Sequence, residues 1–518
     1  MFNGLSEKDG PVKAFVILLA GGMFIACCGR TAQAAGEASG FSFTTARELA
    51  RALAAKDFRP EQNADLPEAL KKLTYDQYQA IRFRPEHSLW KDDHVRFIAQ
   101  FFQRGYLYQD PVKIHVIDGG QVSDVAFSPE QFDYQTNRIP KDLPATLQFG
   151  GFRLLYPLNS PQKMDEVAEF MGASYFRVLG ASQRYGSSLR GLAIDMGEPT
   201  GEEFPRFTEF WLEKPPALAG GIRLYALLDS PSVAGAYSFV IEPGATTLVE
   251  VEASLFFRKS PKKIGLAPLG SLFMTGQNRT RYFPDYRPQV HDSDGLLVEA
   301  GDGDWLWSPL VNPAETYRIS RLPSVEGKRF GLMQRDREFE DYDDLGSRFE
   351  RRPSYWIEPG ENWGPGAVEL LEIPTPNEFN DNIVAYWAPR NLPAPGQELH
   401  LTYRISASLT GPDEGPVMRV RSTRVRPENG GAPPRFVIDF PGTAPHLADL
   451  STAGSAQVQV SEGHVQNLIV QTNDASGGWQ AFFDLVGAAD KRAELRLHLQ
   501  SGSKLESETW IYDYQKSN

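Results

Sequence analysis

The sequence predicts an all-β protein made of two β-sandwich modules, with a few short helices near the N-terminus. At 518 residues, the chain is long enough for about two to four domains. It contains 46 glycines and 38 prolines, which suits a protein with many turns. Short apolar or alternating runs, separated by these turn residues, fill most of the sequence beyond its N-terminal region.

Helical patterns are few. Thr44 or Thr45 can cap a helix over residues 46–56, in which Leu49 and Leu53 lie four positions apart on one face. Other patterns with helix start or stop signals predict three more short helices: 68–73, opened by Pro67; 74–81; and 162–171, which lies between Ser160-Pro161 and Gly172.

Two hairpins stand out among the predicted strands. Lys113–Asp118 and Gln121–Phe127 flank the dipeptide Gly119-Gly120, which favours a tight turn. Ile222–Leu228 and Gly235–Glu242 face each other across a short polar connection.

A proline-rich stretch near residues 388–397 predicts a boundary between two modules. We expect a β-sandwich over 35–390, a linker over 391–398 and a second module over 399–518. The second module contains about seven strand-like segments, the number typical of an immunoglobulin-like sandwich. These segments are 399–409, 434–440, 456–462, 465–471, 479–486, 493–500 and 508–514.

Residues 1–34 have the layout of a cleaved export signal. Lys8 and Lys13 precede the uncharged apolar run Ala14–Cys28, and a small-x-small cleavage site ends at Ala34. The run is shorter than the about 20 apolar residues that a membrane-spanning helix needs. The alternative interpretation is a lipoprotein acylated at Cys27.

Charge and motifs exclude several classes of function. The net charge of −13 argues against a nucleic-acid partner, whose phosphates need a basic surface. The eight histidines are scattered and form no HExxH motif, so no metal site is predicted. The segment 291–295 is similar to the start of a calcium loop, but Leu296 occupies a ligand position. No nucleotide-binding motif or GxSxG elbow occurs, and no cofactor is expected.

Tryptophans and acidic residues interleave in the middle of the chain. Indole faces stack on sugar C–H groups, and carboxylates bind hydroxyls or transfer protons at a glycosidic oxygen, which would make this region a carbohydrate-binding site. The alternative is that the tryptophans fill the sandwich core and the acids occupy turns. The tryptophans are Trp305, Trp307, Trp356, Trp363 and Trp387.

The same region resembles the osmoregulated periplasmic glucan biosynthesis proteins of types G and D. The resemblance runs from about Phe41 to the C-terminus, and no motif decides between the two types. It implies a periplasmic protein with a galactose-mutarotase-like N-terminal sandwich that carries a cleft, followed by an immunoglobulin-like module. The segments that carry it are GASYFRVLGASQRYGSSLRGLAIDMGEPTGEEFPRFTEFW (172–211), LYALLDSPSVAGAYSFVIEPG (224–244), YRPQVHDSDGLLVEAGDGDWLWSPLVNP (286–313), FGLMQRDREF (330–339) and WGPGAVELLEIPTPNEFNDNIVAYW (363–387).

The resemblance also implies inverting cleavage within a β-1,2-linked glucan. It places the general acid at Asp381 and the general base at Asp292. The apolar run after Asp381 predicts partial burial and a raised pKa, as a general acid needs, whereas Asp292 is expected to be ionised in a polar turn. We expect glucan contacts from the five tryptophans together with Phe349 and Glu378.

Two departures from the family pattern leave other functions open. Phe349 occupies a position where the family commonly has tyrosine, and Phe379 one where it has threonine. A missing hydroxyl near the reacting water would favour transglycosylation over hydrolysis. A third hypothesis is a non-catalytic glucan-binding protein that contacts the membrane glucan synthase through its C-terminal module.

Overall fold

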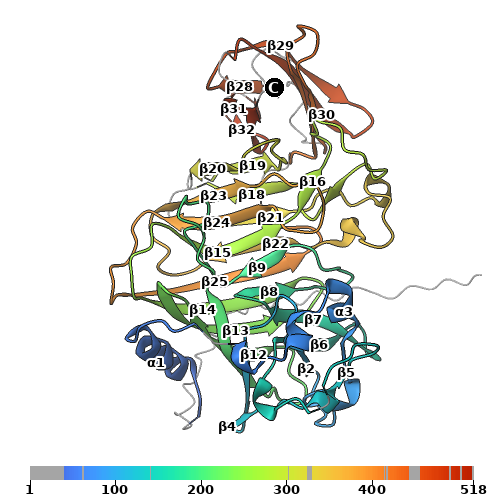
Figure 1. Ribbon diagram of the computed structural model, residues 1–518. Coiled ribbons are helices and arrows are strands. Elements are labelled where there is room, and N and C mark those ends of the chain that lie inside the picture. The colour runs from blue at the N-terminus through green and yellow to red at the C-terminus, as the bar shows by residue number, and fades with distance from the viewer. Residues whose placement is uncertain are drawn as a thin grey trace, which may run out of the picture. The chain divides into compact units, whose positions relative to one another are not determined.

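Strands dominate the structure, a computed structural model, and confirm the predicted all-β class (Figure 1). It describes residues 40–60, 63–140, 142–300, 303–323, 329–412, 415, 418–442, 456–488, 492–501 and 504–515. The predicted export signal and Cys27 lie outside the described residues. No helix among the described residues is long and apolar enough to cross a membrane.

The three α-helices among the described residues all lie early in the chain, as predicted. A capping box formed by Thr74 and Gln77 opens the third one. They are α1 (Phe43–Ala54), α2 (Glu68–Lys71) and α3 (Tyr75–Ala80). Short 3-10 helices occupy several connections: η1 (Asn63–Asp65), η2 (Pro85–His87), η3 (Pro129–Gln131), η4 (Ala145–Leu147), η5 (Phe339–Asp341) and η6 (Phe349–Arg351).

Two large sheets contain most of the strands. The ten-stranded sheet has, in spatial order, β2 (Ile98–Phe102), β6 (Gly151–Ser160), β7 (Lys163–Met171), β8 (Tyr175–Val178), β9 (Ser188–Arg190), β15 (Ile264–Ser271), β24 (Ile383–Pro389), β23 (Gly366–Glu372) and β20 (Arg318–Pro323), and β10 (Leu192–Ile194) pairs with β15. The fifteen-stranded sheet has β28 (Ala456–Val460), β31 (Arg492–Ser501), β33 (Thr509–Gln515), β19 (Trp305–Pro309), β18 (Gly295–Glu299), β21 (Phe330–Met333), β22 (Ser354–Pro359), β25 (Glu398–Ser408), β14 (Thr247–Phe257), β13 (Val233–Glu242), β12 (Ile222–Asp229), β11 (Arg206–Glu213), β3 (Lys113–Asp118) and β4 (Gln121–Asp124), and β32 (Lys504–Leu505) pairs with β31.

These sheets pack face to face over the main hydrophobic core. Phe170 on β7 meets Phe239 on β13, with ring centroids 5.4 Å apart. Helix α1 covers the opposite face of the fifteen-stranded sheet beside β12, β13 and β14 (Figure 1), where Ala46 and Ala50 are buried. Both predicted hairpins are confirmed, as β3–β4 and β12–β13.

A four-stranded sheet forms the other layer of the C-terminal region. It consists of β26 (Ser422–Arg426), β27 (Arg435–Phe440), β30 (Gly478–Val486) and β29 (His464–Asn473). Phe436 of this sheet packs against Trp510 of β33 with ring centroids 5.9 Å apart, so a second core lies between the two layers. Two small two-stranded sheets complete the fold: β1 (Arg82–Phe83) with β5 (Phe132–Asp133), and β16 (Phe273–Thr275) with β17 (Val290–His291).

The helix predicted over 162–171 is wrong, because this segment forms strand β7. Its partner β6 supplies the backbone hydrogen bonds, and Phe170 stacks on Phe152 and Phe176 within the core. A stretch with helix-like start and stop signals can therefore form a β-strand when a neighbouring strand offers both hydrogen-bond pairing and burial.

The expected start of the second module at residue 399 is too early. Strand β25 (Glu398–Ser408) pairs along its length with β14 and also with β22, both of the first sandwich. The parallel pairing of β33 with β19 moreover extends the same sheet into the C-terminal region. Alternating apolar residues predict a strand but not its partner, and pairing alone decides to which sandwich a strand belongs.

Candidate active site

The end of strand β15 brings the two predicted catalytic carboxylates into one region. The backbone N–H of Asp292 donates to Leu272 O at 2.9 Å, and the N–H of Asn382 donates to Ser271 O at 3.0 Å. Adjacent carbonyls of one strand end therefore hold the segment of Asp292 and the segment of Asp381.

Asp381 lies in the loop before β24 and keeps an exposed face. Ser188 Oγ, on the neighbouring strand β9, donates a hydrogen bond to Asp381 Oδ2 at 2.8 Å. Gly270 pairs with Ser188, and a Cβ atom at this position would crowd both Ser188 Oγ and Asp381 Oδ2, so glycine leaves room for their hydrogen bond. The sheet thus fixes one carboxylate oxygen while the residue stays accessible to solvent.

The pKa of the Asp381 carboxyl is raised above its ordinary value. Surrounding protein displaces much of its water, and this desolvation outweighs the opposing charge of Arg177 and the hydrogen bond from Ser188. A raised pKa keeps a carboxyl protonated to higher pH, which suits a proton donor.

Asp292 was expected in a polar turn, but it is buried: the residue is only 6% exposed. Burial raises its pKa to about 6, the charge of Arg352 lowers it, and the charge of Asp381 raises it further. Arg352 Nε lies 3.3 Å from Asp292 Oδ1. Asp292 is therefore mostly ionised at neutral pH, but in a buried rather than a polar environment.

Three buried serines join the segments that carry these carboxylates. Ser271 Oγ lies 3.0 Å from both Ser187 Oγ and Ser293 Oγ, and the latter two oxygens are 3.2 Å apart. Ser187 precedes the partner of Asp381, and Ser293 follows Asp292. Sequence reasoning did not assign these residues, although the GSS triplet 186–188 lies within the densest stretch of the resemblance.

The whole described region fits one family of proteins. The chain matches the family described as "Periplasmic glucan biosynthesis protein, MdoG" over residues 41–514.

It belongs to the MdoG family. Three similar proteins are named Glucans biosynthesis protein G. The protein of Ralstonia nicotianae is 43% identical over 91% of this chain and 95% of its own length, and that of Rhodopseudomonas palustris is 42% identical over 93% and 95%. The protein of Shewanella frigidimarina is 42% identical over 91% and 84%. The resemblance inferred from the sequence is therefore confirmed, and the family is periplasmic and glucan-biosynthetic by name.

Phe349 of this MdoG-family protein lies beneath the site instead of lining it. Its buried ring packs against Tyr342, with centroids 5.6 Å apart, and the guanidinium of Arg352 lies 5.2 Å from its centre. Because Arg352 is the ion-pair partner of Asp292, Phe349 contacts the site through one intermediate residue.

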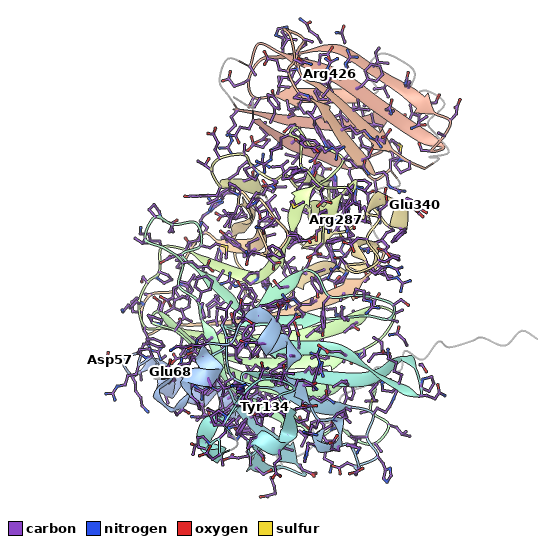
Figure 2. All side chains as sticks on the ribbon, turned by 45° about the vertical axis from the view of Figure 1, so that its right-hand side comes forward. Asp57, Glu68, Tyr134, Arg287, Glu340 and Arg426 are labelled. Carbon is purple, nitrogen blue, oxygen red and sulfur yellow. The ribbon has the colours of Figure 1, made fainter. Side chains whose placement is uncertain are left out.

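Glu378 does lie near the carboxylates, since its charge contributes to the raised pKa of Asp292. Its Oε2 is 2.7 Å from Arg287 Nη1, which also lies 2.9 Å from Asp344 Oδ2. Arg287 is labelled in Figure 2. It holds together the loops that contain Asp285, Asp344 and Glu378.

The expectation that five tryptophans bind glucan is wrong. None is more than 8% exposed, and all pack in the two hydrophobic cores. The alternative interpretation, in which they fill the core, is confirmed. The residues concerned are Trp305, Trp307, Trp356, Trp363 and Trp387.

Other aromatic side chains are exposed beside the site. Phe379 is 82% and Tyr286 is 77% exposed, and each directly neighbours one partner of the Arg287–Glu378 ion pair. Such rings offer apolar faces on which a sugar can stack. The sequence pointed to one of these rings, because Phe379 departs from the family pattern two residues before Asp381.

Metal-ligand geometry and the largest described cavity can be compared with the position of the two carboxylates. No group of three or more His, Cys, Asp or Glu residues among them can hold a metal ion. A cavity of about 840 Å³ lies beside α1, where Leu53, Lys113 and Arg206 are among its lining residues. It contains neither Asp292 nor Asp381.

Proposed function

We propose that this protein cleaves the β-1,2-linked backbone of periplasmic glucans internally, with inversion of the anomeric centre. Asp381 is the general acid and Asp292 the general base. The observation that carries the proposal is the convergence of both carboxyls, each with a raised pKa, at the end of β15. Membership of the MdoG family supports the substrate class.

The two environments suit two different roles. The exposed Asp381 can reach a glycosidic oxygen and deliver its proton as the C–O bond breaks. The buried Asp292 accepts the proton that the attacking water loses. Because Asp292 has little direct contact with solvent, that proton passes through a hydroxyl of the substrate, and Arg352 balances the charge of the base.

The decisive experiment is incubation of the purified protein with linear β-1,2-glucan. Hydrolysis predicts shorter chains, new reducing ends, and products that initially have the inverted anomeric configuration, as seen by proton NMR. A protein that binds the glucan without changing its length distribution would instead support the non-catalytic role beside the membrane synthase.

Transglycosylation by the same residues is the second candidate, and Phe349 is the observation that favours it. Phenylalanine supplies no hydroxyl beneath Arg352, so one hydrogen-bond donor that could orient water near Asp292 is absent at this position. Transfer would yield branched or cyclic products without new reducing ends, which separates it from hydrolysis.

We expect kcat/KM to fall as pH decreases through about 6. Asp292 has its pKa raised to about 6 and must be ionised to accept a proton, so acid inactivates the base. Initial rates of reducing-end formation across this range test the prediction. A rate that still rises below about pH 5 would assign the base to another group.

Replacing Phe379 or Tyr286 with alanine is expected to weaken glucan binding about 3- to 10-fold, because each loses one sugar-stacking ring. Calorimetry in an Asp381→Asn background measures binding without turnover. Tyr317→Ala is the matched control, since Tyr317 is also exposed but its hydroxyl binds Gly197 O on a different part of the fold. Equal losses in all three variants would exclude a specific binding surface.

A further inference from the structure

The segment of Asp292 is tied to the chain beyond β21 through Asp294. Asp294 Oδ2 accepts the backbone N–H groups of Arg335 at 2.7 Å and Asp336 at 3.1 Å. The N–H of Asp294 donates to Met333 O at 2.8 Å. Asp294 is thus held through both its backbone and its side chain, two residues after the proposed base.

The side chain of Arg335 is in turn held by the C-terminal region. Its Nη2 donates to Glu508 Oε1 at 2.7 Å and its Nη1 to Glu508 Oε2 at 2.8 Å, which forms a two-pronged ion pair. The guanidinium lies 3.5 Å from the ring centre of Trp307. Glu508 is 0% exposed and also accepts the N–H of Val420 at 2.8 Å.

A buried ion pair of this kind adds little net stability, because desolvation offsets much of the charge attraction. A two-pronged Arg–carboxylate pair also defines the orientation of the guanidinium plane. The backbone of Arg335, whose N–H holds Asp294, is therefore fixed from the residue just before β33. A continuous series of contacts leads from Glu508 to Asp292.

We propose that Arg335 and Glu508 are positioning residues for Asp292, so that the C-terminal region sets the placement of the general base. The inference rests on the proposed function. The C-terminal region then contributes to the reaction itself and not to glucan binding alone.

The test compares Glu508→Gln, Arg335→Met and the double variant. Each single variant leaves a buried charge without its partner, so we expect a lower thermal midpoint and a kcat reduced at least about 10-fold, with KM within about 2-fold. The double variant removes both charges. It should recover much of the thermal midpoint while kcat stays low, because the contact that places Arg335 is still missing.

The matched control is the Arg435–Asp484 pair of the four-stranded sheet. It is also two-pronged, with distances of 2.7 and 2.8 Å, but it makes no contact with Asp294. Arg435→Met/Asp484→Asn should keep the wild-type kcat. A kcat that recovers with the thermal midpoint in the Arg335→Met/Glu508→Gln variant, or an equal kcat loss in the control, would overturn the inference.

A crystal structure of the Arg335→Met/Glu508→Gln variant gives a readout that needs no activity. We expect the Asp292 segment to be displaced from Leu272 O. Wild-type placement of Asp292 in that variant overturns the inference even if its kcat is low. A wild-type protein that never cleaves glucan, in contrast, overturns the proposed function while the placement can still be measured.

Discussion

Asp381→Asn is expected to reduce kcat on linear β-1,2-glucan about 10²- to 10⁴-fold while glucan still binds. Asparagine has nearly the same shape as aspartate but no proton to deliver to the leaving oxygen. Its side-chain oxygen can still accept the hydrogen bond from Ser188, which lies 2.8 Å from Asp381 Oδ2 in the wild type. The fold and the binding surface are therefore retained. Reducing-end assays give kcat, and calorimetry gives the dissociation constant.

A substrate with an activated leaving group is the control for this variant. A β-1,2-linked oligosaccharide that carries a nitrophenyl aglycone needs little proton donation, because nitrophenolate leaves as a stable anion. Asp381→Asn should cleave this activated substrate at a rate much closer to that of the wild type. Equal losses on the activated and the natural substrate would show that Asp381 is not the proton donor.

Asp292→Asn is expected to lower kcat by a similar factor of about 10²- to 10⁴-fold, since no other group then accepts the proton of the attacking water. Azide is a nucleophile that carries no proton, so it should restore turnover in this variant and form a glycosyl azide. It should not restore turnover on natural glucan in Asp381→Asn. Product analysis by mass spectrometry distinguishes the two variants. Failure of azide to restore turnover in Asp292→Asn would weigh against the role of Asp292 as the base.

The stability of the Asp292 variant provides an independent check. Because burial raises the pKa of Asp292 to about 6, the folded state binds a proton more tightly than the unfolded chain does. The free energy of unfolding of the wild type should therefore fall as the pH rises from about 4 to about 6, because this carboxyl ionises over that range. Asp292→Asn should lack that component. Identical pH dependence in both proteins would contradict the burial of this charge.

Most local structure followed from sequence patterns, and the failures have a common origin. Helix α1 and the β3–β4 and β12–β13 hairpins were predictable, because apolar spacing, paired glycines and alternating apolar residues act over a few positions. The predicted cap at Thr44 or Thr45 was wrong, because α1 begins at Phe43 and both threonines lie within it. Segment 162–171 and the start of the second module were not. In β7 and β25, strand partners that are distant in sequence decided the outcome.

The candidate site was also only partly predictable from the sequence. Asp292 and Asp381 were named from the family resemblance, and the structure brings their segments to one strand end. The tryptophans were assigned to a binding surface although they lie in the hydrophobic cores, because an indole that stacks on sugar and one that fills a core look alike in a sequence. The exposure of Phe379 and Tyr286 was likewise not predictable, because it depends on how the surrounding loops pack.

By itself, the sequence determined the strand-rich class, the early helices and the family to which the chain belongs. Only the tertiary structure decided that Asp292 is buried, that Arg352 balances its charge and that Glu508 holds Arg335. The physical reason is that burial and charge pairing depend on which residues surround a group in space. In a β-sandwich, those neighbours come from strands far apart in the chain.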